Sequence, residues 1–258
     1  MDDAVIRAIV ALPFGLVVGS FMTVAVHRLP AGESVVGGRS RCPSCGATIG
    51  ARDNVPVLSW LLLRGRCRNC GARISVMYPL IELGTAGLVV LAAIRYADPW
   101  QAVLVAGLLA LMPAIAVIDL RHKIIPNRLT YPALLAAAAI VLLGWLIDDA
   151  VDPVRAALGF LLYGGGLFVV AAVSRGMGMG DVKLAALIGL VLGSLGLRFV
   201  GVAAGAAIVL GGVGALGALA MGKGRKSAIP FGPYLAAGAV VAGLWGEPIS
   251  AWYIERFL

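Results

Sequence analysis

Long apolar runs separated by short polar segments dominate this sequence. A helix needs about 20 apolar residues to cross a bilayer, and about eight runs reach or approach that length. We therefore expect transmembrane helices at Val5 to Val26, Tyr78 to Ile94, Pro99 to Ile118, Tyr131 to Ile147, Val154 to Val173, Val182 to Leu197, Phe199 to Met221 and Phe231 to Gly246. The fold class that this pattern predicts is an all-α polytopic membrane protein.

One polar region interrupts the pattern, between the first and second runs, and it divides the chain into three parts. Residues 1–26 form a first transmembrane helix, residues 27–77 a loop domain, and residues 78–258 a seven-helix membrane domain. The loop domain has few aliphatic residues and cannot build a large core. We therefore expect a bound metal to hold it folded.

Composition and charge support this class and suggest an orientation. Of the 258 residues, 60% are hydrophobic and 13% are charged. If residues 27–77 are cytoplasmic, sixteen of the 21 Lys and Arg fall on that side and five on the other, which satisfies the positive-inside rule. Both termini then face away from the cytoplasm. The net charge of +8 is spread over many loops, which argues against a nucleic-acid partner and leaves the lipid bilayer as the expected surroundings.

The loop domain holds every cysteine of the chain, in two Cys-x-x-Cys pairs: Cys42, Cys45, Cys67 and Cys70. This spacing is typical of a closed tetrahedral zinc site, in which the glycine after each pair adopts a positive φ. Two disulfides are the alternative, which a reducing cytoplasm disfavours. We predict one structural Zn²⁺.

Two acidic residues lie at the ends of apolar runs. Asp181 follows Gly178-x-Gly180 at the start of one run, where it could simply cap the helix. Asp119 ends another run, where an anion meets the negative end of the helix dipole. The topology puts both at the cytoplasmic boundary, so we expect a dyad that shares a proton. Helix-end electrostatics favour an ionised Asp181 and a protonated Asp119.

Three further residues near these acids have open interpretations. Gly178 and Gly180 would let an extended peptide approach the acid, or they serve only to form a turn. Glu82 lies about one turn inside the second run, where it either pairs with a loop arginine or lines a site open to the cytoplasm.

Together these motifs resemble the type IV prepilin peptidase family, from Gly19 to the final run. The resemblance is carried by Gly19-Ser-Phe-Met-Thr-Val-Ala-Val-His-Arg-Leu-Pro30, the paired cysteines, Tyr78-Pro-Leu-Ile-Glu82, Asp119 with Ile125-Pro-Asn127, Gly178-x-Gly-Asp181-x-Lys-Leu and Ile229-Pro-Phe-Gly-Pro-Tyr-Leu235.

The resemblance implies a GxGD-type aspartyl protease of the bacterial inner membrane. Such an enzyme cleaves the leader of type IV prepilins or type II pseudopilins and methylates the new N-terminus with S-adenosylmethionine. It implies a catalytic pair, Asp119 and Asp181, supported by Gly178, Gly180 and Lys183. It also implies a methyltransferase region that includes Gly65, Arg66 and Glu82.

Two other interpretations are weaker. A proton-coupled transporter would use intramembrane acids, but no inverted repeat is visible and both acids lie at an edge. A zinc-ribbon membrane scaffold without activity is disfavoured by the intact Gly-x-Gly-Asp motif. The sequence leaves homo-oligomer formation open.

Overall fold

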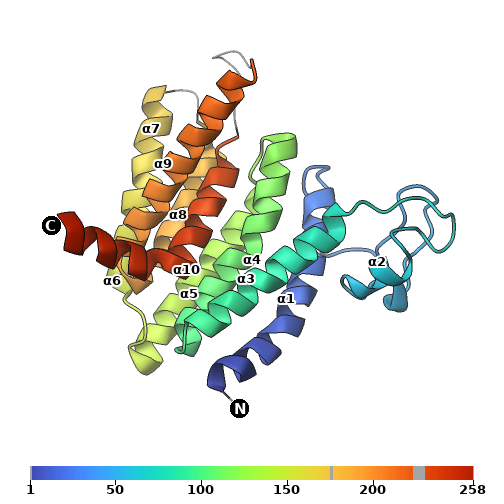
Figure 1. Cartoon of the computed structure of the whole chain (residues 1–258), viewed down its shortest axis with the longest axis horizontal. Coiled ribbons are helices and arrows are strands. Elements are labelled where there is room, and N and C mark those ends of the chain that lie inside the picture. Colours follow the sequence, from blue (N-terminus) through green and yellow to red (C-terminus); the bar gives the residue numbers. More distant parts are fainter. Residues whose placement is uncertain (1, 175–176, 223–229, 258) are drawn as a thin grey trace.

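The computed structural model describes residues 2–174, 177–222 and 230–257, and over these residues the fold is all-α (Figure 1). Its elements are α1 (Asp3–Arg28), the 3-10 helix η1 (Ala51–Asp53), α2 (Leu58–Leu62), α3 (Met77–Arg95), α4 (Pro99–His122), α5 (Asn127–Asp148), α6 (Pro153–Gly159), the π-helix η2 (Phe160–Gly165), α7 (Gly166–Ser174), α8 (Met179–Leu195), α9 (Leu197–Ala220) and α10 (Gly232–Phe257).

All eight predicted runs are helical, and α6, η2 and α7 together form the fifth. Six helices of the described chain are long and apolar enough to cross a membrane: Asp3–Arg28, Met77–Arg95, Pro99–His122, Asn127–Asp148, Pro153–Ser174 and Leu197–Ala220. The polytopic membrane class is therefore confirmed. Neither α8 nor α10 is among these six, so the number of spans stays a prediction.

Side-chain caps explain where several helices begin. Asp98 accepts a hydrogen bond from the backbone N–H of Gln101 at 2.8 Å, and Pro99 occupies the first turn of α4. Asp152 caps α6 in the same way, through the backbone N–H groups of Val154 and Arg155. In both helices the capping carboxylate satisfies N–H groups that have no partner within the helix.

The core of the bundle forms around α8, which is short but mostly buried. It packs closely on the fifth helix because glycines on both sides remove side chains from the contact. A Cβ on Gly189 would overlap the carbonyl of Gly159, and one on Gly164 would lie 2.6 Å from the Cβ of Ala186. These glycines therefore allow close helix packing.

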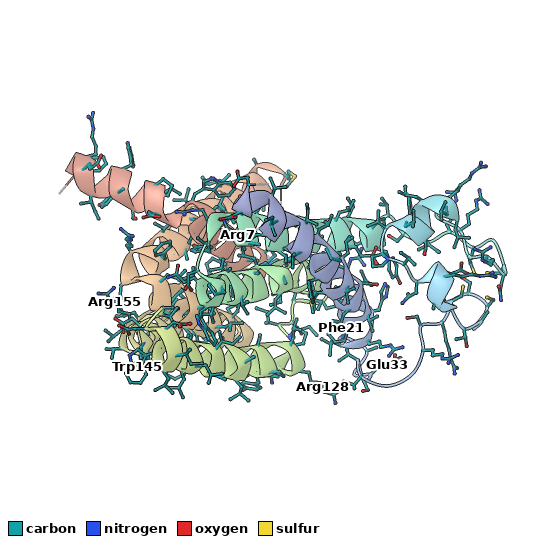
Figure 2. The ribbon with its side chains drawn as sticks, turned by 90° about the horizontal axis from the view of Figure 1, so that it is seen from below. Arg7, Phe21, Glu33, Arg128, Trp145 and Arg155 are labelled. Carbon is teal, nitrogen blue, oxygen red and sulfur yellow. The ribbon has the colours of Figure 1, made fainter. Side chains whose placement is uncertain are left out.

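The outer surface of the bundle is apolar. Phe21 and Trp145 project outward in Figure 2 and are 42% and 44% exposed. Exposed apolar residues of this kind occur along most of the helices, which suits contact with lipid tails.

The segment between α1 and α3 forms a separate lobe beside one end of the bundle (Figure 1). We call residues 29–76 the cysteine lobe. Its first turns are tied to the bundle by Arg128 of α5, which donates to the carbonyls of Gly32 and Glu33, each at 3.3 Å (Figure 2). At the other end of the chain, α10 contains Pro248 and its last part bends away from the bundle (Figure 1).

Candidate active site and metal centre

The four cysteines sit on two matching turns. The N–H of Cys42 bonds to the carbonyl of Ala47 at 2.9 Å, and the N–H of Gly46 returns to the carbonyl of Cys42 at 2.8 Å. The second pair repeats this pattern, with Cys67 bonded to Ala72 and Gly71 to Cys67 at 2.8 and 2.9 Å. Each turn closes through a glycine with φ of 70°, as the sequence predicts.

The geometry of the sulfur atoms fits a tetrahedral metal. All four Sγ atoms lie within 4.8 Å of one another, the cysteines form no disulfide, and Cys42 Sγ is 3.9 Å from Cys70 Sγ. Zn–S bonds of about 2.3 Å at the tetrahedral angle imply S···S separations of roughly 3.8 Å. Hydrogen bonds from the backbone N–H groups of Cys45 and Ser44 lower the pKa of Cys42 to about 6, which favours a thiolate there, whereas hydrogen bonds with the neighbouring thiols raise the pKa of Cys70 to about 11.

Gly65 supports the lobe from within. Its φ is +65°, and a Cβ at this position would lie 2.9 Å from Cζ2 of Trp60. The Trp60 indole in turn donates to the carbonyl of Ile74 at 3.1 Å. Arg66, the neighbouring predicted residue, forms an antiparallel backbone bridge with Arg73. Both predicted residues therefore belong to the framework of the lobe.

An ion pair also holds the lobe together. The guanidinium of Arg68 donates hydrogen bonds of 2.7 to 3.0 Å to the carboxylate of Asp53. These hydrogen bonds lower the pKa of Asp53 below its ordinary value and raise that of Arg68. Arg68, which the sequence places beside the thiolates, is thus engaged by a carboxylate.

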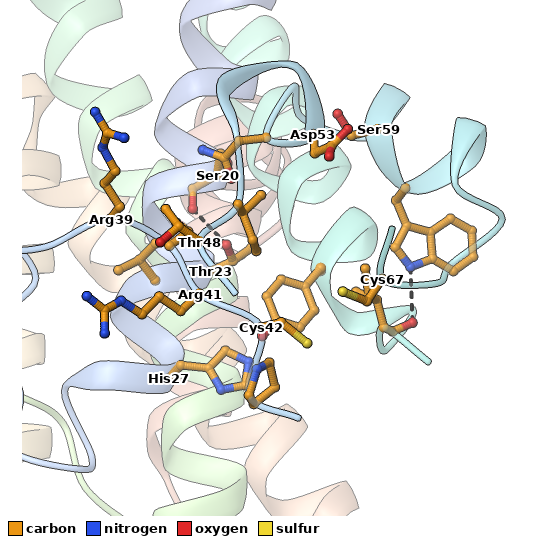
Figure 3. Close-up of a pocket in the computed structure, with 18 of the residues that line it drawn as sticks. Ser20, Thr23, His27, Arg39, Arg41, Cys42, Thr48, Asp53, Ser59 and Cys67 are labelled. Carbon is orange, nitrogen blue, oxygen red and sulfur yellow. Dashed lines mark hydrogen bonds between the residues drawn. The ribbon is translucent and has the colours of Figure 1, made fainter. Parts of the chain in front are cut away.

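A cavity of about 710 Å³ lies between the lobe and the ends of α1 and α3. Figure 3 shows part of its lining, with Thr23 and His27 from α1 and with Cys42 and Cys67 from the lobe. His27 stacks on Tyr78 of α3, with ring centroids 4.9 Å apart. The walls of this cavity carry aromatic, cationic and acidic groups. Gly65 and Arg66 do not line it.

Glu82 is the acid that reaches this cavity from the membrane helices. It is 7% exposed, and its Oε2 accepts the backbone N–H of Val57 at 2.7 Å. Val57 has φ of 63° and ψ of −53°, and the N–H of Leu58 bonds to the carbonyl of Pro56 at 2.6 Å, which defines a γ-turn. No described arginine forms an ion pair with Glu82, so of the two interpretations the structure favours the cavity-lining one.

The two predicted acids come from different helices and interact electrostatically. Asp119 lies in the last turn of α4 and Asp181 in the first turn of α8. Asp119 is 5% exposed, and its Oδ2 accepts the backbone N–H of Gly232 at 2.9 Å. The expectation from helix-end electrostatics did not include this third partner, which comes from the start of α10. In the sequence, only the prolines on either side of Gly232 indicated a bend near the two acids.

The residues around Asp181 hold α8 in place. A Cβ on Gly180 would lie 3.0 Å from the Cβ of Ile125, so this glycine allows close packing. A Cβ on Gly178 would lie 3.5 Å from Oδ2 of Asp181, an ordinary contact distance. Lys183 donates to Oδ1 of Asn127 at 2.9 Å and its amine lies 5.0 Å from the ring centre of Tyr131, which ties α8 to α5.

The acid pair and the cavity lie at the same end of the bundle. Arg121, two residues after Asp119, interacts electrostatically with His27 and with Tyr78, which line the cavity. The last turn of α4 therefore borders both the acid pair and the cavity.

Two family models match most of the chain. The bacterial peptidase A24 N-terminal domain matches residues 13–96, and the type IV leader peptidase family matches residues 103–216. No solved structure matches significantly.

Similar curated proteins cover nearly the full length of the chain and share one description, prepilin leader peptidase/N-methyltransferase. The protein from Aeromonas hydrophila is 36% identical over 273 residues, covering 95% of this chain and 93% of the relative. That from Bacillus subtilis is 36% identical over 247 residues, covering 95% and 97%. That from Dichelobacter nodosus is 35% identical over 269 residues, covering 92% and 91%.

Proposed function

The chain belongs to the type IV leader peptidase family, and from this premise we propose that it is a bifunctional prepilin leader peptidase and N-methyltransferase. It removes the leader of type IV prepilins or type II pseudopilins and methylates the residue that becomes N-terminal. The observation that carries the peptidase half is the pairing of Asp119 with Asp181 from two different helices. Nothing favours the transporter or the inactive scaffold.

Peptide cleavage by this pair follows from the chemistry of two neighbouring carboxyl groups. One carboxylate takes a proton from a water molecule, whose oxygen adds to the scissile carbonyl carbon, and the other carboxylic acid gives its proton to the carbonyl oxygen. The resulting gem-diol collapses when the second carboxylate takes back a hydroxyl proton. The C–N bond breaks, the leaving nitrogen takes the proton from the first carboxyl group, and both acids regain their initial states.

The site suits a substrate that is itself partly in the membrane. A prepilin with an apolar helix and a basic leader would lie with its helix in the bilayer and its leader in the cytoplasm. We place the acid pair and the cysteine lobe on the cytoplasmic side of the bacterial inner membrane, supported by the positive-inside bias of the loops. Cleavage then takes place at the membrane boundary.

The cavity at the lobe is our candidate site for S-adenosylmethionine. Its volume of about 710 Å³ and its mixed aromatic and charged walls suit a ligand with an adenine ring, a carboxylate and a sulfonium. When bound, this cofactor supplies an electrophilic methyl group. Tyr78 and His27 offer aromatic surface, and Glu82 is placed to orient the substrate amine or accept its proton.

The division of labour within the chain follows the three parts predicted from the sequence. We propose that residues 27–77 fold around one structural Zn²⁺ bound by the four cysteines and carry much of the methyltransferase region. Residues 1–26 and 78–258 form the membrane-embedded part, in which the last seven helices hold the peptidase site. The thiol geometry supports zinc, because the sulfur spacing matches a tetrahedral site.

One experiment tests both activities. The purified protein in proteoliposomes is incubated with a prepilin-like peptide, with and without S-adenosylmethionine, and the product masses are measured. We expect a leaderless peptide in both reactions and a further mass of one methyl group only with the cofactor. An intact peptide in both would contradict the peptidase assignment, and a leaderless, unmethylated peptide in both would contradict the methyltransferase half.

A further inference from the structure

The start of α10 supplies a third component of the acid pair. The N–H of Gly232 donates to Oδ2 of Asp119 at 2.9 Å in a buried setting. In the first turn of a helix the backbone N–H groups have no partner within the helix. Here the N–H groups of Tyr234 and Leu235 bond to the carbonyl of Phe231, and the N–H of Gly232 finds its partner in the carboxylate of Asp119.

Only glycine fits at this position. A Cβ on residue 232 would lie 2.6 Å from Oδ2, 3.0 Å from Cγ and 3.2 Å from Cβ of Asp119. Side-chain atoms do not approach one another this closely, so any other residue would push the carboxylate away from its place. The backbone of α10 and the Asp119 side chain are therefore fitted to each other.

A backbone N–H that donates to a carboxylate favours its ionised form and fixes its orientation. Among the described residues of the elements packed around Asp119, Asp181 of α8 is the titratable group that interacts with it electrostatically. Arg121, on α4 itself, interacts with His27 and Tyr78. The Gly232 N–H is thus the polar donor that meets Asp119 directly.

We propose that the Gly232 N–H is a positioning group of the peptidase site. It holds the Asp119 carboxylate in the orientation in which it shares a proton with Asp181. The inference rests on the proposed peptidase function and concerns only that half of the activity.

The sharpest test removes the N–H and adds no atom. Cell-free synthesis with glycolic acid at position 232 replaces the amide by an ester. A hydrogen bond to a charged group is worth enough to predict a fall in kcat of about 10- to 100-fold, with KM unchanged. One limb of the pH–kcat profile should also move, because the acid pair loses a hydrogen-bond donor, while methylation of a pre-cleaved peptide stays unchanged.

The matched control is the same ester at Gly201, a glycine near the start of α9 where a Cβ would meet no atom within 4 Å. It loses a helical hydrogen bond near the C-terminus of α8, at the opposite end of that helix from Asp181, and should leave both limbs of the profile in place. An ester at 232 that leaves kcat unchanged, or lowers it without moving either limb, overturns the inference.

A second variant tests the fit of the side chain. Gly232→Ala keeps the N–H but adds the clashing Cβ, so we expect loss of cleavage with methylation of a pre-cleaved peptide retained. Wild-type cleavage by this variant would also overturn the inference. If the unmodified chain cleaves no prepilin-like peptide, the proposed function itself fails, whereas a cleaving chain that is insensitive at position 232 refutes only the role of Gly232.

Discussion

At the scale of single residues, we propose that the peptidase chemistry depends on two carboxyl groups, those of Asp119 and Asp181. Asp119→Asn or Asp181→Asn keeps the shape of the side chain and removes its acid–base function. We expect cleavage to fall by about 100- to 10,000-fold, because general acid–base catalysis contributes that much. Methylation of a pre-cleaved peptide should remain, since the cavity is lined by other residues.

The two activities are assayed separately on each aspartate variant, with zinc content and detergent-extracted yield as checks of folding. A folded, zinc-loaded variant that loses both activities would show that the aspartates also serve methyl transfer. In that case the separation into two sites would be wrong.

Glu82 offers a prediction on the methyltransferase side. Glu82→Ala leaves the N–H of Val57 without its acceptor, and an unpaired buried donor costs about 1–3 kcal/mol. We expect methylation to fall sharply and cleavage to persist. Glu82→Gln retains an acceptor oxygen, so comparison of the two variants by methyl incorporation separates holding Val57 from taking a proton.

If Glu82→Gln methylates like the wild type and Glu82→Ala does not, the carboxylate acts by holding the γ-turn at Val57. Equal loss in both variants indicates that the ionised group itself is required. Wild-type methylation by Glu82→Ala would contradict any role for this residue.

Sequence reasoning located single residues where local rules apply. Asp119 and Asp181 were identifiable because each acid lies at one end of an apolar run. The glycines after the cysteine pairs were identifiable because the turn that follows each pair requires a positive φ. The Gly232–Asp119 hydrogen bond was not identifiable, since it joins positions 113 residues apart and depends on tertiary packing. Whether Glu82 pairs with an arginine or lines a cavity was likewise not identifiable, because it depends on where the cysteine lobe docks on the membrane helices.

At the scale of elements, the cysteine lobe should depend on its metal. Structural zinc contributes on the order of 10 kcal/mol to folding in small domains. We expect Cys70→Ser, or removal of the metal by a chelator, to expose the lobe to limited proteolysis and to abolish methylation. Cleavage by the membrane helices should persist. Metal analysis of the wild type that finds no zinc would contradict the site.

Gly65 tests the interior of the lobe. Gly65→Ala places a Cβ against the Trp60 ring and imposes an unfavourable positive φ, so we expect a less stable lobe and reduced methylation. Gly50→Ala is the matched control in the same lobe, because its φ is negative and its Cβ would meet no atom within 4 Å. Equal effects of the two variants on methylation and on protease sensitivity would contradict this explanation.

Close packing of α8 on α6 gives another prediction. Gly189→Ala would push a Cβ into the backbone of Gly159, and overpacking of this kind typically costs about 1–3 kcal/mol. We expect a lower melting temperature in detergent and reduced cleavage, because α8 carries Asp181. Gly205→Ala, which meets no atom within 4 Å, should melt like the wild type. An unchanged melting temperature for Gly189→Ala would argue against the tight contact.

The helices themselves were largely predictable, because hydropathy and flanking polar residues define membrane segments well. The π-helix at Phe160–Gly165 was not, since its residues continue the apolar run without a change of period. It occurs where Gly159 and Gly164 lie against α8, so contact between helices shapes it. Helix α8 is two residues shorter at its C-terminus than its predicted run and α10 extends well beyond Gly246.

At the scale of the whole molecule, the charge distribution predicts an orientation. An alkaline phosphatase fused after Leu258 should be active in a bacterial host, because we expect the C-terminus to face away from the cytoplasm. The same enzyme inserted after Gly38 in the cysteine lobe should be inactive. The reverse pattern of activities would place the lobe and the acid pair on the opposite side of the membrane.

The docking of the lobe on α1 and α3 has a consequence for the history of such chains. The cavity takes one wall from the lobe and the other from membrane helices, and the γ-turn at Val57 is anchored on Glu82 of α3. A gene fragment encoding the lobe alone would carry the cysteines but only half of the cavity. With methyl transfer assigned to this cavity, as we propose, the lobe is not a unit that functions by itself, and recombination would transfer methylation between proteins only together with the two helices that flank it.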